Sequence, residues 1–174
     1  MTDIVPLQDI DATAVECLLD AAFGSDRHGR TAYRMREGAE MLAGLCFAAV
    51  EDGALVGSIQ CWPVALTDPV GKAHPMIMVG PVAVHPAVQR SGIGRALMHA
   101  MLGQVAPGEQ LPLVMIGDPE YYGRFFDFWA TRTGGWQVPG PYEQHRLLAR
   151  VDADVVLPET GMLGPWKPLQ RRTG

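Results

Sequence analysis

The stretch "VHPAVQRSGIGRALM", residues 84–98, places two glycines one residue apart in a short basic turn. The apolar run before it, residues 76–84, reads "MIMVGPVAV" and is typical of a buried strand. The residues after the turn predict a helix from about Gly92 to Leu102. The turn therefore lies where a strand leads into a helix, and the first turn of a helix presents unpaired N–H groups and a partial positive charge. Such a turn can bind an anion.

Glycine in this turn allows a phosphate oxygen to approach the backbone closely, because Gly92 and Gly94 have no side chains. Gln89, Arg90 and Arg95 can supply further donors around the same position. For an isolated G-x-G pair, the alternative is an ordinary turn whose glycines only satisfy the backbone geometry. The rest of the sequence has to decide between these readings.

Two other phosphate-binding loops do not match this turn. A dinucleotide-binding fingerprint would require glycine at Leu97, and an NTPase loop would require Lys followed by Ser or Thr at Arg95 and Ala96. Both patterns are excluded by these residues.

Length and composition predict one globular domain over residues 1–174, with a C-terminal tail from about residue 155. The three cysteines are far apart and form no metal or redox motif, so no metal is expected. The sequence begins without a secretory pattern and contains no apolar stretch of about 20 residues, which favours a cytoplasmic protein that does not bind membranes. A net charge of -5 argues against nucleic-acid binding and favours cationic partners.

Hydrophobic spacing predicts a helix over 11–23 that Asp11 could cap, and a weaker helix over 31–44 that Gly44 ends. Asp52-Gly53 predicts a hairpin within 46–64. The remaining expected elements are a loop over 65–75, a strand over 111–117, a short helix from Pro119 and one strand between 134 and 151. This alternation indicates an α+β or α/β fold, with α/β-type layers around a mixed sheet.

The run from "VGPVAVHP" through "QRSGIGRALM" to "EYYGRF" resembles the GNAT superfamily of acyl-CoA-dependent N-acyltransferases. Over residues 46–128 it is similar to a poorly characterised bacterial branch of predicted N-acetyltransferases. The resemblance implies the GNAT fold, with a mostly antiparallel central sheet in which the strand over 111–117 splays away from the preceding strand. It also implies acetyl-CoA as cosubstrate, with the pantetheine arm beside the backbone of the preceding strand and the pyrophosphate on the glycine turn. The implied cofactor-binding residues are Val82, Ala83, Val84, Gln89, Arg90, Ser91, Gly92, Ile93, Gly94 and Arg95.

The same resemblance implies that Tyr122 is the general acid that protonates the departing CoA thiolate, with Tyr121 as the adjacent alternative. Either ring could instead pack among the neighbouring phenylalanines. The Gly-Phe pair that usually follows this helix in the family is replaced here by Phe126-Asp127.

No general base is assigned, because the strand over 76–84 carries no ionisable side chain. The outside candidates are His28, His74, Asp118 and Glu120. Asp118 directly precedes Pro119, so a helix cap also explains it, and His85 is interpreted as structural. The acceptor is expected to contact the segment "GSDRHGRTAYRMRE" and its arginines, with Trp62 and "GGWQVPGPYE" as candidate walls. Those arginines are Arg27, Arg30, Arg34 and Arg36.

The sequence therefore predicts an acyltransferase that moves an acetyl group from acetyl-CoA to a primary amine by direct attack in a ternary complex. The acceptor is a small-molecule or peptide amine, and the chain is compatible with a homodimer. The alternative is a non-catalytic acyl-CoA-binding module that senses CoA status or regulates a partner. Release of free CoA thiol in the presence of amines would separate the two hypotheses.

Overall fold

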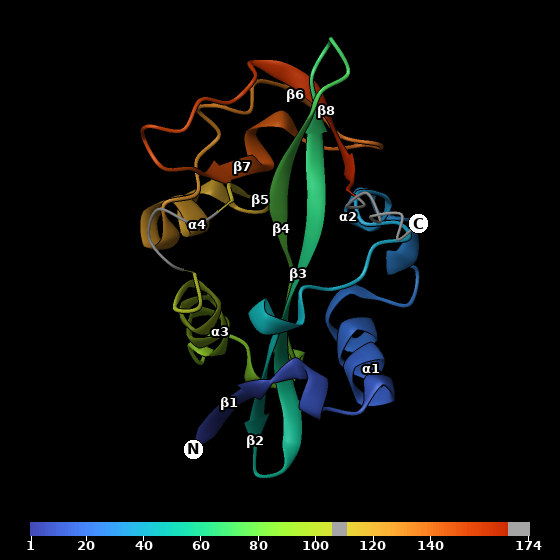
Figure 1. The fold of residues 1–174 in the computed structure, drawn as a ribbon. Helices are drawn as coiled ribbons and strands as arrows, with labels where there is room; N and C mark the ends of the chain where they lie inside the picture. The colour runs from blue at the N-terminus through green and yellow to red at the C-terminus, as the bar shows by residue number, and fades with distance from the viewer. Residues whose placement is uncertain (106–110, 167–174) are drawn as a thin grey trace, which may run out of the picture.

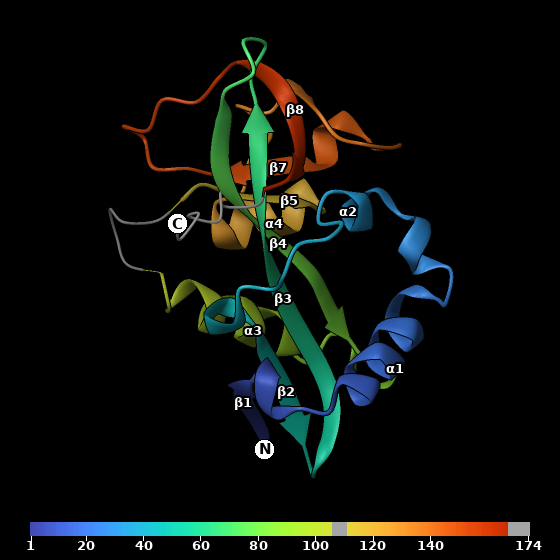
Figure 2. The same cartoon turned by 45° about the vertical axis from the view of Figure 1, so that its right-hand side comes forward.

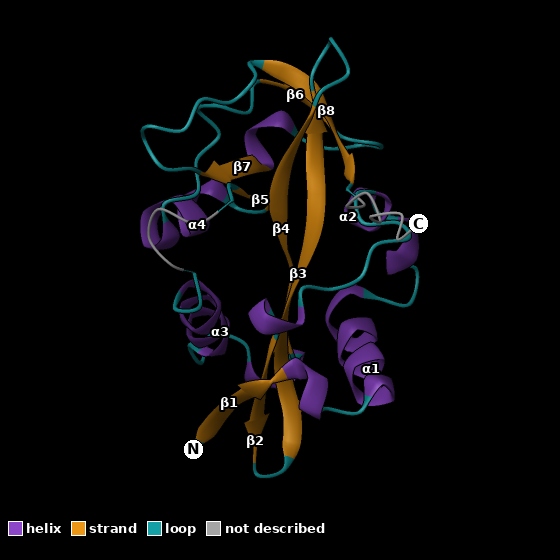
Figure 3. Cartoon of the chain, in the orientation of Figure 1, coloured by secondary structure: helices purple, strands orange, loops and turns teal. Residues whose placement is uncertain are grey.

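The computed structural model describes residues 1–105 and 111–166, which form a mixed sheet with helices packed on it. Within these residues the sheet has eight strands in the order β1-β2-β3-β4-β5-β7, and β8 pairs with both β3 and β6. Every named strand pair is antiparallel except β4 with β5 and β6 with β8. The expected α+β architecture with a mixed, mostly antiparallel sheet is confirmed (Figure 3). The strands are β1 (Thr2–Pro6), β2 (Phe47–Glu51), β3 (Ala54–Thr67), β4 (Ala73–Val84), β5 (Leu113–Ile116), β6 (Gly135–Gln137), β7 (Leu147–Arg150) and β8 (Thr160–Pro165).

The four α-helices of the described chain are α1 (Ala12–Phe23), α2 (Thr31–Arg34), α3 (Ile93–Leu102) and α4 (Pro119–Phe126). Helices α1 and α3 lie on opposite sides of the long β3–β4 hairpin (Figures 1 and 2). In α1 the buried positions Val15, Leu18 and Leu19 follow helical spacing, which is why this helix packs one face on the sheet. Within the described residues, no helix is both long and apolar enough to cross a bilayer.

The hairpin predicted around Asp52-Gly53 is confirmed, with both residues at positive φ angles. The expected loop over 65–75 is wrong, because β3 and β4 pair as far as Thr67 and Ala73. Asp68 closes the short connection, since its Oδ1 accepts hydrogen bonds from the N–H groups of Val70 and Lys72. The two strands are therefore joined by a short turn, and not by the longer loop that the prolines and the glycine predicted.

The expected helix over 31–44 is also wrong, because α2 ends at Arg34 after one turn. The next residues, Met35 and Arg36, are buried against the sheet instead of continuing an amphipathic helix. Further on, the N–H of Leu42 donates to the carbonyl of Cys61, which ties this segment along β3. Tertiary contacts therefore override the helical spacing.

Part of the expected C-terminal tail belongs to the sheet. Strand β8 pairs with β3 from Thr67↔Met162 to Val64↔Pro165, and Leu163 is fully buried. The apolar side chain of Leu163 fills the core beneath the hairpin, which explains why this segment does not remain a tail. Strand β1 was not predicted and pairs with β2 at the edge of the sheet.

The expected splay between two central strands is confirmed. Strands β4 and β5 pair in parallel only at Ile77↔Leu113 and Met78↔Val114. Beyond Met78, β4 continues to Val84 through a cis Gly80–Pro81 peptide, while β5 ends at Ile116. The β5-facing side of β4 is therefore open near the glycine turn, and this opening positions the candidate site.

Candidate active site

The glycine turn has two residues in the left-handed region, Arg90 at φ 68° and Gly92 at φ 83°. The Ser91 hydroxyl donates to the carbonyl of Val88 at 2.5 Å, which fixes the turn before α3. The first intrahelical bond of α3 runs from the N–H of Ala96 to the carbonyl of Gly92. The preceding amides at 93–95 have no intrahelical acceptor, so they are available to an anion.

The histidine of the same turn has a structural role, as expected. The ring Nδ1 of His85 accepts a hydrogen bond from the N–H of Ala87 at 3.1 Å. This bond caps the short helical turn after β4 and holds the chain in position before Gln89.

A cleft of about 470 Å³ opens over the turn and the end of β4. It brings together eight of the ten residues predicted to bind the cosubstrate, whereas Ala83 is buried in the core and Ser91 does not line the cleft. Ala22, Phe23 and the two adjacent tyrosines complete its wall. The eight are Val82, Val84, Gln89, Arg90, Gly92, Ile93, Gly94 and Arg95.

A second cavity of about 790 Å³ adjoins this cleft, and Phe23, Val82 and Tyr122 line both. We call the first the cofactor cleft and the second the acceptor cavity. The acceptor cavity is bounded by the segment 23–33, the β4 residues 78–82, the end of β5 and the segment 141–146. The two spaces thus meet beside the phenol of Tyr122.

Tyr122 occupies the junction because α4 starts directly after β5. A Cβ added at Gly117 would come within 2.8 Å of the Tyr122 ring, so the ring packs tightly over the strand end. Tyr121 meets this ring edge-on at 4.9 Å between centroids, but it lines only the cofactor cleft. Of the two tyrosines, only Tyr122 faces both spaces.

Burial, together with smaller contributions from the nearby Tyr121 and Asp118, raises the pKa of Tyr122 to about 12, while Arg146 acts in the opposite direction. The phenol is therefore protonated at neutral pH. Among the described residues its hydroxyl makes no hydrogen bond, so the proton is available to a bound molecule.

Of the four outside candidates for the base, only Asp118 lines the acceptor cavity. Its Oδ1 accepts from the N–H of Glu120 at 3.0 Å, which confirms the predicted helix cap. His74 pairs with Asp68 at 2.9 Å beside the tip of the β3–β4 hairpin, outside both spaces. His28 lies outside the lining, with its Nε2 3.2 Å from Nη1 of Arg27.

The four arginines near α2 do not form one group. Arg27 is buried, pairs with Glu16 and Asp20, and donates to the hydroxyl of Tyr33 at 2.7 Å. Burial opposes its charge, but the hydrogen bonds to Glu16 and Tyr33 outweigh burial and raise its pKa. Arg27 and Arg30 line the acceptor cavity, whereas Arg34 does not.

Arg36 is buried between two aromatic rings, with its guanidinium carbon 4.0 Å from the ring centre of Tyr33 and 4.2 Å from that of Trp62. Its Nη1 donates to Oε1 of Gln60 at 2.8 Å. Burial lowers the pKa of Arg36. Arg36 and Trp62 therefore support α2 from below and do not line the cavity, contrary to expectation.

Glu143, the last residue of the expected wall "GGWQVPGPYE", lines the acceptor cavity, whereas sequence reasoning missed the charged residue Arg146. Arg146 follows that segment directly before β7, and the pairing of β7 with β5 brings it to the cavity. The N–H of Gly117 donates to the carbonyl of Arg146 at 2.9 Å, which fixes this approach.

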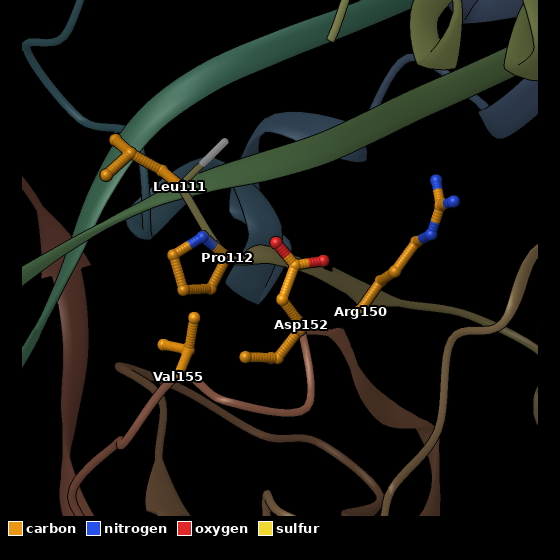
Figure 4. A pocket seen from close by; sticks show the side chains of 6 residues that line it. Leu111, Pro112, Arg150, Asp152 and Val155 are labelled. Carbon is orange, nitrogen blue, oxygen red and sulfur yellow. The ribbon is translucent and has the colours of Figure 1, made fainter. Parts of the chain in front are cut away.

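A separate pocket of about 40 Å³ lies beside β5 and β7, lined by Leu111, Pro112, Arg150, Asp152 and Val155 together with Val151 (Figure 4). It shares no lining residue with the other two spaces, and its volume suits a few water molecules at most. In the part of the chain that the structure describes, no three His, Cys, Asp or Glu side chains gather as metal ligands.

Comparison with known proteins identifies relatives of this arrangement. The family model described as an acetyltransferase (GNAT) domain matches residues 3–126. The uncharacterized N-acetyltransferase YhbS of Escherichia coli (strain K12) is 28% identical over 142 residues, which cover 79% of this chain and 83% of that protein.

Two solved structures have a similar fold. The Escherichia coli YhbS structure in complex with CoA superposes with a TM-score of 0.68 at 22% identity, covering 95% of this chain and 89% of that chain. A GNAT family acetyltransferase from Brucella melitensis in complex with acetyl-CoA gives a TM-score of 0.65 at 24% identity, covering 94% and 95% respectively.

Proposed function

The chain belongs to the GNAT acetyltransferase family, and we propose that it transfers an acetyl group from acetyl-CoA to a primary amine by direct attack in a ternary complex. The observation that carries this proposal is the junction of the cofactor cleft and the acceptor cavity at Val82 and Tyr122. Because the two spaces meet there, a thioester in one and an amine in the other can come into contact.

The chain's own residues fit the acyl donor. The free amides of Ile93, Gly94 and Arg95 at the start of α3 are suited to the pyrophosphate. Beyond Met78, the edge of β4 has no β5 partner, so the backbone at Val82–Val84 can pair with the amide groups of the pantetheine arm. The two related structures that hold CoA or acetyl-CoA support this assignment.

In the proposed reaction the amine nitrogen forms a bond to the acetyl carbon, the carbon–sulfur bond breaks, and the thiolate takes a proton. Tyr122 supplies that proton from its hydroxyl, because its raised pKa keeps it protonated and it faces the junction. The amine loses its proton to solvent, and solvent restores the phenol. No side chain is assigned as general base.

Family membership favours the enzyme over the non-catalytic acyl-CoA-binding module. The proposal includes a cytoplasmic enzyme whose acceptor is a small-molecule or peptide amine, acting without a metal. Incubating the protein with acetyl-CoA and a panel of primary amines tests it, with free CoA thiol as the readout. We expect thiol release that depends on the amine. Tight binding of acetyl-CoA without release from any amine would favour the sensor module instead.

A further inference from the structure

Two segments far apart in the sequence are joined across one side of the acceptor cavity. The hydroxyl of Thr31, at the start of α2, donates to the carbonyl of Pro141 at 2.6 Å. Nearby, Nη1 of Arg34 lies 3.5 Å from the carbonyl of Pro139. Because Thr31 and Pro141 both line the cavity, this contact forms part of its wall.

A glycine makes this contact close. Gly140 has a φ of 155°, and a Cβ added there would lie 2.5 Å from Oγ1 of Thr31 and 3.3 Å from Nη1 of Arg34. A side chain at this position would therefore push the loop away from α2. The sequence "PGPY" places its glycine between the two prolines whose carbonyls accept these hydrogen bonds.

The segment that contains Pro139 and Pro141 is also fixed at its C-terminal end, by Arg146. Arg146 exchanges hydrogen bonds with Gly117: its carbonyl accepts from the Gly117 N–H at 2.9 Å, and its Nε donates to the Gly117 carbonyl at 3.4 Å. Between the two ends, the hydroxyl of Tyr142 donates to the carbonyl of Trp136 at 2.9 Å. The segment 139–146 is thus tied to α2 through Thr31 and to the end of β5 through Gly117, and its residues Pro141, Tyr142, Glu143 and Arg146 line the cavity. We call this tied segment the acceptor rim.

We propose that the acceptor rim restricts the acceptor to a small primary amine that fits wholly within the cavity, and excludes a polypeptide. This inference rests on the proposed function. The cavity volume of about 790 Å³ lies within the range of pockets that enclose small molecules. A polypeptide whose amine reached Tyr122 from this side of the cavity would have to cross the rim and displace the contacts of Thr31 and Arg146.

Calorimetry with three probes tests the inference without knowledge of the natural acceptor. The probes are CoA, CoA joined through its acetyl group to methylamine, and CoA joined in the same way to the N-terminus of a pentapeptide. We expect the methylamine conjugate to bind at least as tightly as CoA, and the peptide conjugate to bind at least tenfold more weakly than the methylamine conjugate. Equal or tighter binding of the peptide conjugate would overturn the inference while leaving acetyl-CoA binding intact. Failure of CoA itself to bind would instead overturn the proposed function, and the inference with it.

Gly140→Ala should open the rim and reduce the difference between the two conjugates at least threefold, with the affinity for CoA unchanged. Gly134→Ala is the matched control, because a Cβ at Gly134 meets no atom within 4 Å, and it should keep the wild-type difference. If Gly140→Ala does not fold, Thr31→Val removes the hydroxyl at nearly constant volume and should reduce the difference in the same direction. A folded variant that keeps the full difference would show that the rim does not select the acceptor.

Discussion

The carboxylate of Asp118 caps the helix that carries Tyr122. Its Oδ1 accepts from the N–H of Glu120 at 3.0 Å, and its backbone carbonyl accepts from the N–H of Tyr122 at 2.9 Å. The same residue helps to raise the pKa of the Tyr122 phenol, after burial and Tyr121. One residue therefore orients the phenol and favours its protonated form.

Tyr122→Phe should lower kcat about 10²-fold, near the low end for a positioned general acid, because a CoA thiolate is a fair leaving group. The ring packing over Gly117 is kept, so the affinity for acetyl-CoA should change less than twofold. Steady-state kinetics with an accepted amine, together with calorimetry, measure both quantities.

Tyr121→Phe is the matched control for this prediction. Its ring lines only the cofactor cleft, so we expect a loss of less than tenfold in kcat. If Tyr121→Phe lost activity and Tyr122→Phe did not, the acid would be Tyr121. If neither variant slowed the reaction, solvent would be the proton donor.

The raised pKa of Tyr122 also predicts a loss of stability at alkaline pH. In the unfolded chain a tyrosine ionises near pH 10, whereas in the folded protein Tyr122 ionises at about 12. Between these values unfolding releases a proton, so the free energy of unfolding falls as pH rises, by at most about 1.4 kcal/mol per pH unit from this group. Denaturant unfolding from pH 9 to 11.5 should give a shallower decline for Tyr122→Phe, and an identical decline in both proteins would contradict the assignment.

Gly94→Val should weaken the binding of acetyl-CoA at least tenfold. A Cβ at Gly94 meets only Cγ2 of Val84, at an ordinary 3.6 Å, so the fold should tolerate the change. The added methyl groups would instead occupy the cofactor cleft where the anion approaches the amides of α3. Calorimetry measures the affinity and thermal unfolding the stability. Wild-type affinity in the folded variant would remove the glycine turn from the cofactor site.

The gathering of the predicted cofactor residues around one cleft follows from sequence because these residues are close together in the chain. The strand, the turn and the start of α3 are consecutive, and Gly92 requires a backbone geometry that glycine favours. The acceptor side depends on contacts between distant segments. Arg146 reaches the cavity only because β7 pairs with β5, and the hydrogen bond between Thr31 and Pro141 spans 110 residues. Neither relation leaves a local pattern.

The errors in secondary structure have the same origin. The spacing over 31–44 is compatible with a helix, but the stacking of Arg36 between Tyr33 and Trp62 holds the chain against β3 instead. Strand β8 contains two glycines and a proline, a composition that predicts an irregular tail. Its pairing with β3 nevertheless buries Leu163. In both cases, packing against the sheet determined the structure of the segment more than its local sequence pattern did.

The positions of the arginines indicate which substitutions should change the KM for the acceptor. Arg30 lines the acceptor cavity, and its Nη2 donates to the carbonyl of Phe23 at 2.8 Å, whereas Arg34 is exposed and does not line the cavity. Arg30→Ala should raise the acceptor KM at least threefold, and Arg34→Ala should have a smaller effect. Acceptor kinetics at saturating acetyl-CoA measure this difference. An Arg30→Ala enzyme with unchanged KM and turnover would remove this arginine from the acceptor site.

Two substitutions at Asp118 separate its cap from its charge. Asp118→Ala removes the cap and should lower the free energy of unfolding by about 1 kcal/mol, within the usual range for a lost N-cap. Asn is an equally good N-cap, so the free energy of unfolding of Asp118→Asn should stay within about 0.5 kcal/mol of the wild-type value in urea.

Removal of the negative charge in Asp118→Asn should lower the pKa of the Tyr122 phenol, because Asp118 is one of the groups that raise it. The alkaline loss of stability should then begin near pH 10 in both proteins, because the unfolded-state pKa is the same, but it should end at a lower pH and be smaller in total in Asp118→Asn than in the wild type. If both Asp118 variants unfolded at the same urea concentration, the hydrogen bond from the Glu120 N–H to Asp118 would contribute nothing measurable to the stability of α4.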